Sequence, residues 1–357
     1  MTKQEFEKSV EAARQSQAYA QYCTVRDAVF AMLEQQSKLD ASPSGYWRTE
    51  LAGFDYMFDA SPLIIAKLRH HTYHLTGLKE YEYRNHHARN APRLADRLHY
   101  LEAQDTHGMR VPESPDLGGF GYTIDGALYN VDTLKFYESL IVMDQQGLLD
   151  QFRNARERRL VLEIGAGWGG LAYQFKTLFP NTTYVVVDLP GSILFGATYL
   201  KTLFPHARTL IIDGTNASAK IPQAKEYDFI FVPHCAWKEL TLPRPDLLMN
   251  MCSFQEMTTM QVERYIAQAR AWGIGHVYSV NRDHSPNNPE LTRVSEILAR
   301  HYTITYDKNL FDAKPTIEGF SPKSVLRRAK RLVKQATARS REDIRRYRHL
   351  IGTLREN

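Results

Sequence analysis

An apolar run at residues 160–164 leads directly into a segment, residues 165–170, that holds four glycines in six residues. The run has the composition of a buried parallel strand, and it carries one acid near its end. Glycine permits a tight turn and lets the backbone approach a ligand where a Cβ would clash. The pattern predicts a strand that leads into a nucleotide-binding turn, and the residues that carry it are Glu163, Gly165, Gly167 and Gly169.

A second acid stands at the end of the next predicted strand. Residues 183–188 form a mostly apolar run that ends in Asp188, 23 residues after Gly165. In a doubly wound sheet this spacing places a carboxylate beside the first turn, where it can accept hydrogen bonds from both ribose hydroxyls of a ligand. The two strands together predict a site for a cofactor that contains adenosine.

The details of the turn indicate which cofactor this is. A dinucleotide fingerprint has the form Gly-x-Gly-x-x-Gly and turns backbone amides toward a pyrophosphate. Here Glu163 precedes glycines at residues 165, 167 and 169, a tighter spacing than that of the dinucleotide fingerprint. The carboxylate of Glu163 would repel a pyrophosphate but suits the ammonium group of S-adenosylmethionine. This first motif resembles that of the class I S-adenosylmethionine-dependent methyltransferases. An NAD-dependent oxidoreductase, which shares the sheet and the ribose-binding acid, stays open as an alternative.

Further segments are similar to the bacterial putative sugar O-methyltransferase family, over about residues 50 to 310. The resemblance implies S-adenosylmethionine as the methyl donor, S-adenosylhomocysteine as the product, and a sugar or glycan hydroxyl as the acceptor, including cell-surface polysaccharide and lipid-linked glycans. A non-catalytic scaffold of the same fold in glycan assembly is a further alternative. The segments that carry the resemblance are residues 61–71, 126–130, 184–190, 246–257 and 278–282, and within them residues 253–257 contribute most.

Methyl transfer to a hydroxyl is an in-line displacement that needs a base for the hydroxyl proton. Glu256 follows a predicted strand and several uncharged residues, so a partly dry surrounding would raise its pKa. It could instead cap a helix that starts near Thr258. His234 ends the predicted strand 227–233 and has an ordinary pKa of about 6.5, which suits a base, although a structural histidine fits the same position. We therefore expect Glu256 or His234 to act as the base.

Other polar residues follow predicted strands or lie in the N-terminal part. Asp213 ends a short strand where the methyltransferase resemblance implies a contact to adenine, although it could also begin a turn with Gly214. Ser253 is a further candidate for the cofactor. We expect an N-terminal lid and the strand ends to bind the acceptor, through Tyr129, Asn130, His71, Gln255, Asn281 and Arg282.

A metal site is not predicted. His70 and His74 have the spacing of a helical metal pair, but no glutamate lies between them and no third ligand is evident. Mg²⁺ is compatible with the chemistry but is not indicated by any motif. Three scattered cysteines among 357 residues exclude a disulfide framework and a zinc knuckle.

Length and composition predict two structured parts and a tail. With 43% hydrophobic and 24% charged residues, the chain is typical of a globular protein and is longer than one average domain. Alternating strands and helices predict an α/β fold with a doubly wound, mostly parallel sheet. We expect a mainly helical N-terminal region or lid at 1–150, an S-adenosylmethionine-binding domain at 151–320, and a basic helical tail at 321–357.

The positive charge of the chain is concentrated in that tail. Residues 322–357 hold twelve Lys or Arg and three acids, a net +9, which leaves −4 for residues 1–321 of the total +5. An apolar stripe interleaved with these cations suits contact with an anionic membrane surface, although a solvated helix packed on the protein fits the same pattern. A second helix is expected over residues 342–354. A single aromatic residue, Tyr347, argues against nucleic-acid binding.

The expected location follows from the absence of membrane signals. The first residues lack the apolar core of a signal peptide, and no apolar run approaches the roughly 18 residues that span a bilayer. We expect a cytoplasmic protein, peripheral on the inner face of the membrane if the tail binds there. A homo-oligomer is compatible with the sequence.

Overall fold

The computed structural model describes residues 2–38, 43–153, 155–214, 220–283, 288, 293–309 and 347–355. Most of the basic tail, and with it the expected membrane contact, lies outside these residues. Of the helices that the structure describes, none combines the length and the apolar content that a bilayer span requires.

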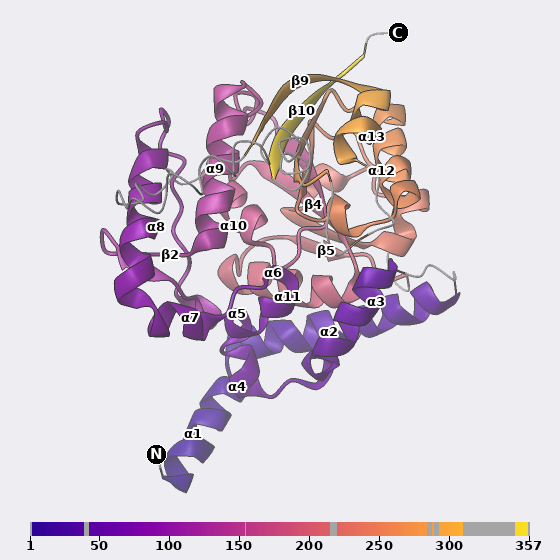
Figure 1. Ribbon diagram of the computed structural model, residues 1–357. Helices are drawn as coiled ribbons and strands as arrows, with labels where there is room; N and C mark the ends of the chain where they lie inside the picture. Colours follow the sequence, from indigo (N-terminus) through magenta and orange to yellow (C-terminus); the bar gives the residue numbers. More distant parts are fainter. Residues whose placement is uncertain are drawn as a thin grey trace, which may run out of the picture.

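One eight-stranded sheet forms the centre of the molecule (Figure 1). All of its pairings are parallel except those of the last strand, β10, which runs antiparallel to both of its neighbours. The predicted mostly parallel α/β sheet is therefore confirmed. Its spatial order is β5-β6-β4-β3-β7-β8-β10-β9, and the strands are β3 (Arg159–Ile164), β4 (Thr182–Asp188), β5 (Thr209–Ile211), β6 (Phe229–Pro233), β7 (Leu247–Met251), β8 (His276–Asn281), β9 (Tyr302–Asn309) and β10 (Arg348–Leu354).

Helices cover both faces of this sheet. Alternate residues of the central strands enter two separate clusters of buried side chains, so Val186 packs on one side and Val187 on the other. Figure 1 shows α9 and α10 on one side of the strands and α12 and α13 on the other. The covering helices are α9 (Val131–Gln145), α10 (Gly170–Leu178), α11 (Pro190–Leu203), α12 (Thr259–Ala271) and α13 (Val294–His301).

The N-terminal region is mainly helical, as expected, and it shares a core with the sheet. Buried residues of α2, among them Val25 and Met32, belong to the same cluster as Phe195 of α11. Helix α1 extends away from the rest of the molecule (Figure 1). The elements are α1 (Lys3–Arg14), α2 (Gln17–Lys38), α3 (Gly45–Leu51), η1 (Ala52–Asp59), α4 (Pro62–Ile65), α5 (Leu68–His71), α6 (Tyr73–Thr76), α7 (Glu80–Asn85), α8 (His87–Glu102), η2 (Asp116–Gly118), β1 (Tyr122–Ile124) and β2 (Ala127–Tyr129).

The helix expected over residues 342–354 is wrong in its described part, because Arg348–Leu354 forms β10. Leu350 and Ile351 are almost fully buried, and the strand lies between β8 and β9. Its neighbours on both sides satisfy its backbone groups, and this tertiary pairing overrides the local helical pattern. The sheet therefore includes residues well beyond the expected boundary at 320.

Candidate functional site

A cavity opens at the carboxyl ends of β3, β4, β6 and β7, where ligands bind in doubly wound sheets. Strands β4 to β6 lie on one side of β3 and strands β7 to β10 on the other, and this change of side between β3 and β7 creates the crevice there. Elements from three parts of the sequence line the cavity. They contribute Glu163, Gly165, Gly167, Asp188, His234, Ser253 and Glu256 from the sheet ends, Ser44, Trp47, Asp132 and Lys135 from the N-terminal region, and Tyr347 from the residue before β10.

The glycine loop turns as the sequence indicates. Gly165 has φ +73°, and a Cβ there would lie 2.0 Å from the Ser253 hydroxyl oxygen. Its N–H donates to the Val187 carbonyl at 2.8 Å. Gly167 has φ +57° and faces open space, and its N–H donates to Asp188 Oδ2 at 2.8 Å. Both glycines border the cavity, so the backbone itself forms part of its wall.

Gly169 has a different position from the other two loop glycines. It starts α10 at φ +85°, and a Cβ there would contact Leu200 and the backbone of Gly196 in α11. It is not among the residues that line the cavity. The structure therefore assigns Gly169 to the packing of α10 against α11 rather than to the cofactor site expected for it.

Two buried carboxylates flank the loop. Glu163 is 1% exposed and accepts a hydrogen bond from the Tyr184 hydroxyl at 2.7 Å. Burial raises the pKa of Glu163 to about 8. Burial also raises the pKa of Asp188 to about 6, although the N–H groups of Gly167 and Leu189 favour its ionised form. A cationic ligand would stabilise both carboxylates in their charged form.

The order of the strands brings His234 to the cavity and leaves Asp213 outside its lining. Strand β6 lies between β4 and β5, and Pro233 pairs with Asp188 in the register of the sheet. His234 follows Pro233 directly and lines the cavity. Strand β5 is displaced to the edge, and Asp213 beyond its end is not among the lining residues. The adenine contact expected for Asp213 is therefore not supported by its place in the sheet.

Glu256 lies in a short 3-10 helix, η5 (Phe254–Glu256), and lines the cavity. Its backbone carbonyl accepts a hydrogen bond from the Ser44 hydroxyl at 2.8 Å. Burial raises the pKa of the Glu256 carboxyl to about 8, against the opposing effect of a hydrogen bond from Gln255 and the charge of Lys135. Thr258 caps α12 through a capping box with Gln261, so the capping role considered for Glu256 belongs to another residue.

The polar residues after β7 and β8 form a network behind the cavity wall. Ser253 lines the cavity and donates to the Ile164 carbonyl at 3.1 Å. The Gln255 N–H donates to Asn281 Oδ1 at 3.2 Å, and its side-chain amide donates to the Tyr347 hydroxyl at 3.3 Å. Arg282 donates its N–H to Gln255 Oε1 at 3.0 Å, and its guanidinium lies 4.3 Å from the centre of the Tyr347 ring. Gln255, Asn281 and Arg282 therefore support the wall and do not line it as expected.

The three acceptor-binding residues expected in the N-terminal region are also not among the residues that line the cavity. Asn130 is fully buried and caps α9, accepting from the Thr133 N–H at 3.0 Å. Tyr129 pairs with Tyr122 in the β1–β2 hairpin and is 2% exposed. The His71 ring is hydrogen-bonded to a tyrosine hydroxyl at 2.8 Å.

Several lining residues carry little signal in the sequence. Asp132 and Lys135 follow Asn130 closely, and their i,i+3 spacing of opposite charges is common on helix surfaces. Ser44 and Tyr347 come from opposite ends of the chain, about 300 positions apart. Only the fold brings them to the same cavity.

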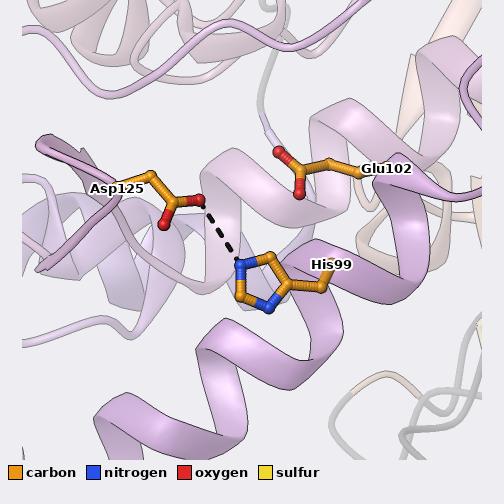
Figure 2. A group of neighbouring side chains, drawn as sticks. All are labelled: His99, Glu102 and Asp125. Atoms are coloured by element: carbon orange, nitrogen blue, oxygen red, sulfur yellow. Dashed lines mark hydrogen bonds and ion pairs between the residues drawn. The ribbon is translucent and has the colours of Figure 1, made fainter.

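A separate cluster contains His99 and Glu102 of α8 and Asp125 of the β1–β2 turn (Figure 2). His99 Nε2 lies 3.4 Å from Asp125 Oδ2, and all three side chains are at least partly exposed. Arg110 forms ion pairs with both Glu102 and Asp125. This guanidinium already supplies the positive charge that a metal would bring.

No protein-family model matches the sequence, and no curated protein matches it. Among solved structures, similarity is found to a phosphoethanolamine N-methyltransferase 2 of Haemonchus contortus in complex with S-adenosyl-L-methionine, at 13% identity over 60% of this chain with a TM-score of 0.34. This chain spans about half of that protein, 52% of its length.

Two further solved structures are N-methyltransferase NodS from Bradyrhizobium japonicum in complex with S-adenosyl-L-homocysteine and magnesium protoporphyrin IX methyltransferase from Synechocystis with bound SAM. NodS is 15% identical over 60% of this chain and 88% of its own, with a TM-score of 0.34. The Synechocystis protein is 9% identical over 73% of this chain and 97% of its own, with a TM-score of 0.35. Each of these alignments covers only part of this chain.

Proposed function

We propose that this protein is an S-adenosylmethionine-dependent O-methyltransferase that acts on a hydroxyl of a sugar or glycan. One observation carries the choice of cofactor. The N–H groups of Gly165, Gly167 and Gly169 already donate to acceptors of the protein, namely the Val187 carbonyl, Asp188 Oδ2 and the Ala166 carbonyl. A dinucleotide site needs such amides for its pyrophosphate.

The charges of the cavity support the same choice. Glu163, Asp188 and Glu256 all line it. The ammonium and sulfonium groups of S-adenosylmethionine would favour the ionised form of these carboxyls, whereas a pyrophosphate would oppose their ionisation. Asp188 at the end of β4 is placed to accept hydrogen bonds from ribose hydroxyls. Together with the doubly wound sheet, this ligand supports class I methyltransferase chemistry.

The reaction needs one proton acceptor. The acceptor oxygen attacks the methyl carbon, the carbon–sulfur bond breaks, and its electron pair stays on sulfur to give S-adenosylhomocysteine. Glu256, with a pKa near 8 in its buried position, takes the hydroxyl proton. His234 lines the same cavity and is the competing candidate for this role. The assignment of a sugar rests on the resemblance of residues 253–257 and on the polar lining of the N-terminal wall.

Ligand-induced thermal shifts test the cofactor. S-adenosylhomocysteine should raise the melting temperature of the protein while NAD leaves it unchanged, and Asp188→Asn should reduce the shift. Asp27→Asn, at an exposed helix position, serves as the control and should respond like the parent. Stabilisation by NAD alone would favour the oxidoreductase, and no response to either ligand would favour the scaffold.

An acceptor screen tests the sugar. We expect transfer of a labelled methyl group from S-adenosylmethionine to a pyranoside hydroxyl, with the position established by mass spectrometry and NMR. Transfer only to amines or to small phenols, with normal S-adenosylhomocysteine binding, would retain the methyltransferase and reject the sugar.

A further inference from the structure

The cavity wall formed by α9 contains a buried carboxylate, that of Asp132. Among the described residues, only one of its two oxygens has a hydrogen-bond donor. Asp132 is 2% exposed and lines the cavity together with Lys135. Its Oδ1 accepts a hydrogen bond from Lys135 Nζ at 2.9 Å. Its Oδ2 is also buried, and among the residues that the structure describes it has no hydrogen-bond partner. A buried carboxylate oxygen without a hydrogen-bond donor destabilises the folded protein.

The start of α9 does not account for this carboxylate. Asn130 and Thr133 form the capping box of the helix, so the first-turn N–H of Thr133 is bonded without Asp132. A negative charge in the first turn is favourable to the helix, but an exposed acid would provide that effect without the penalty of burial. The open lone pairs of Oδ2 therefore indicate a ligand group that donates a hydrogen bond inside the cavity.

The Asp132–Lys135 pair lies close to the proposed base. The charge of Lys135 acts on Glu256, Cys252 and Tyr347, all of which line the cavity. Burial disfavours the ammonium form of Lys135, but Asp132, together with Cys252 and Tyr347, outweighs this effect and raises its pKa, so the group remains a hydrogen-bond donor. One acceptor and one donor are thus held side by side next to the carboxylate proposed to take the proton.

We propose that Asp132 and Lys135 bind two neighbouring hydroxyls of a polyhydroxylated acceptor, adjacent to the hydroxyl that is methylated. One hydroxyl donates to Asp132 Oδ2, and the other accepts from Lys135 Nζ. Because the pair is neutral overall, it fits an uncharged pyranoside better than a phosphate or carboxylate, which would have to lie against Asp132. This inference rests on the proposed function and names the part of the acceptor that the enzyme recognises.

The test uses the full-length protein, S-adenosylmethionine and four probes: the methyl glycosides of glucose, galactose, mannose and rhamnose. Asp132→Asn keeps the shape of the side chain, and Asp132→Asn/Lys135→Met removes both charges without leaving one unpaired in the cavity. Glu296→Gln breaks an exposed i,i+3 ion pair and serves as the control. Each protein is assayed for KM and kcat with the best probe and with its monodeoxy analogues, and for binding of S-adenosylhomocysteine.

In both Asp132 variants we expect the acceptor KM to rise about 10-fold or more, as for loss of a hydrogen bond to a charged group. Binding of S-adenosylhomocysteine should stay within about 2-fold, and Glu296→Gln should match the parent. The preference of the parent for the full glycoside over the analogue that lacks the neighbouring hydroxyl should disappear in Asp132→Asn. A merely structural role for Asp132 would not remove that preference.

Other outcomes separate this inference from the proposed function. If S-adenosylhomocysteine does not bind the parent protein, the proposed function itself fails. Normal binding of S-adenosylhomocysteine together with an unchanged KM and an unchanged preference in both variants would overturn the inference alone. A parent protein that binds S-adenosylhomocysteine but neither binds nor methylates any of the four glycosides would also overturn it.

Discussion

The guanidinium of Arg69 lies 3.4 Å from the centre of the Trp168 ring. Arg69 belongs to α5 and is 1% exposed, while Trp168 stands between Gly167 and Gly169 in the loop that borders the cavity. Arg69 also donates to Glu113 Oε1 at 2.6 Å. The N-terminal region thus holds the glycine loop through a stacked cation whose own charge is neutralised by a buried acid.

We expect Arg69→Lys to lower the free energy of unfolding by about 2–4 kcal/mol. Lysine keeps the positive charge, but it has no planar guanidinium to stack on the Trp168 ring and cannot reproduce the hydrogen bonds that this group donates. Urea unfolding measures this difference, and isothermal titration should show weaker S-adenosylhomocysteine binding. Arg26→Lys is the matched control, since Arg26 lies 5.7 Å from the Tyr22 ring and pairs with an exposed acid. Equal stability of the two variants would contradict the role of Arg69.

Gly165→Ala should be more damaging than Gly167→Ala. Both positions have positive φ, so both variants incur a backbone penalty of about 1–2 kcal/mol. Only at Gly165 does the new Cβ meet another side chain, that of Ser253, which adds about 1–3 kcal/mol of overpacking. Thermal unfolding and S-adenosylhomocysteine titration of the two variants check this order, and a reversed order would show that the loop is arranged differently.

The stability of the protein should fall as pH rises from about 4.5 to about 8. Glu163 has a raised pKa in the folded state, so the folded protein holds this proton more tightly than the unfolded chain does. Between the two values the free energy of unfolding declines by at most about 1.4 kcal/mol per pH unit from this group. Glu163→Gln should make the decline smaller, measured by urea unfolding at pH 5, 7 and 9, while Asp188 and Glu256, whose pKa values are also raised, still contribute to it. Glu226→Gln, at an exposed surface position, should leave the decline as in the parent.

Glu256→Gln should lower kcat by about 100-fold or more while S-adenosylhomocysteine still binds, because the variant lacks the proton acceptor. For the parent, kcat/KM should rise with pH up to about 8, where the carboxyl becomes ionised. Stopped-time assays across pH 6–9.5 measure both effects. His234→Gln separates the two candidates, since loss of turnover in that variant with near-normal turnover in Glu256→Gln would move the role to His234.

The last strand should be essential for folding. Leu350→Ala removes a side chain that is 1% exposed in β10 and should reduce the free energy of unfolding by about 2–5 kcal/mol. Leu354→Ala, at the half-buried end of the same strand, should have a much smaller effect. Urea unfolding of the two variants provides the comparison. Similar small losses in both would show that β10 is not part of the stable sheet.

Several features of the fold and the site can be read from local spacing. The strand, glycine loop and helix at residues 159–178 depend on residues within about 20 positions of one another, and the structure forms them as expected. Asp188 and Glu256 also reach the cavity, because Asp188 ends β4 and Glu256 follows β7, and the ends of both strands border it. Periodicity and glycine positions determine such elements, since their backbone geometry is a local property.

Tertiary structure alone decides the rest. Insertion of β6 between β4 and β5 brings His234 to the cavity and takes Asp213 away, and strand order is a nonlocal result of packing. Pairing with β8 and β9 turns residues 348–354 from an expected helix into β10 and positions Tyr347. Capping buries Asn130, whereas Asp132 and Lys135, two and five residues further on, line the cavity. The sequence by itself thus determined the glycine loop and the strand-end acids of the proposed cofactor end, because these depend on local spacing, and long-range packing decided which residues form the proposed acceptor end.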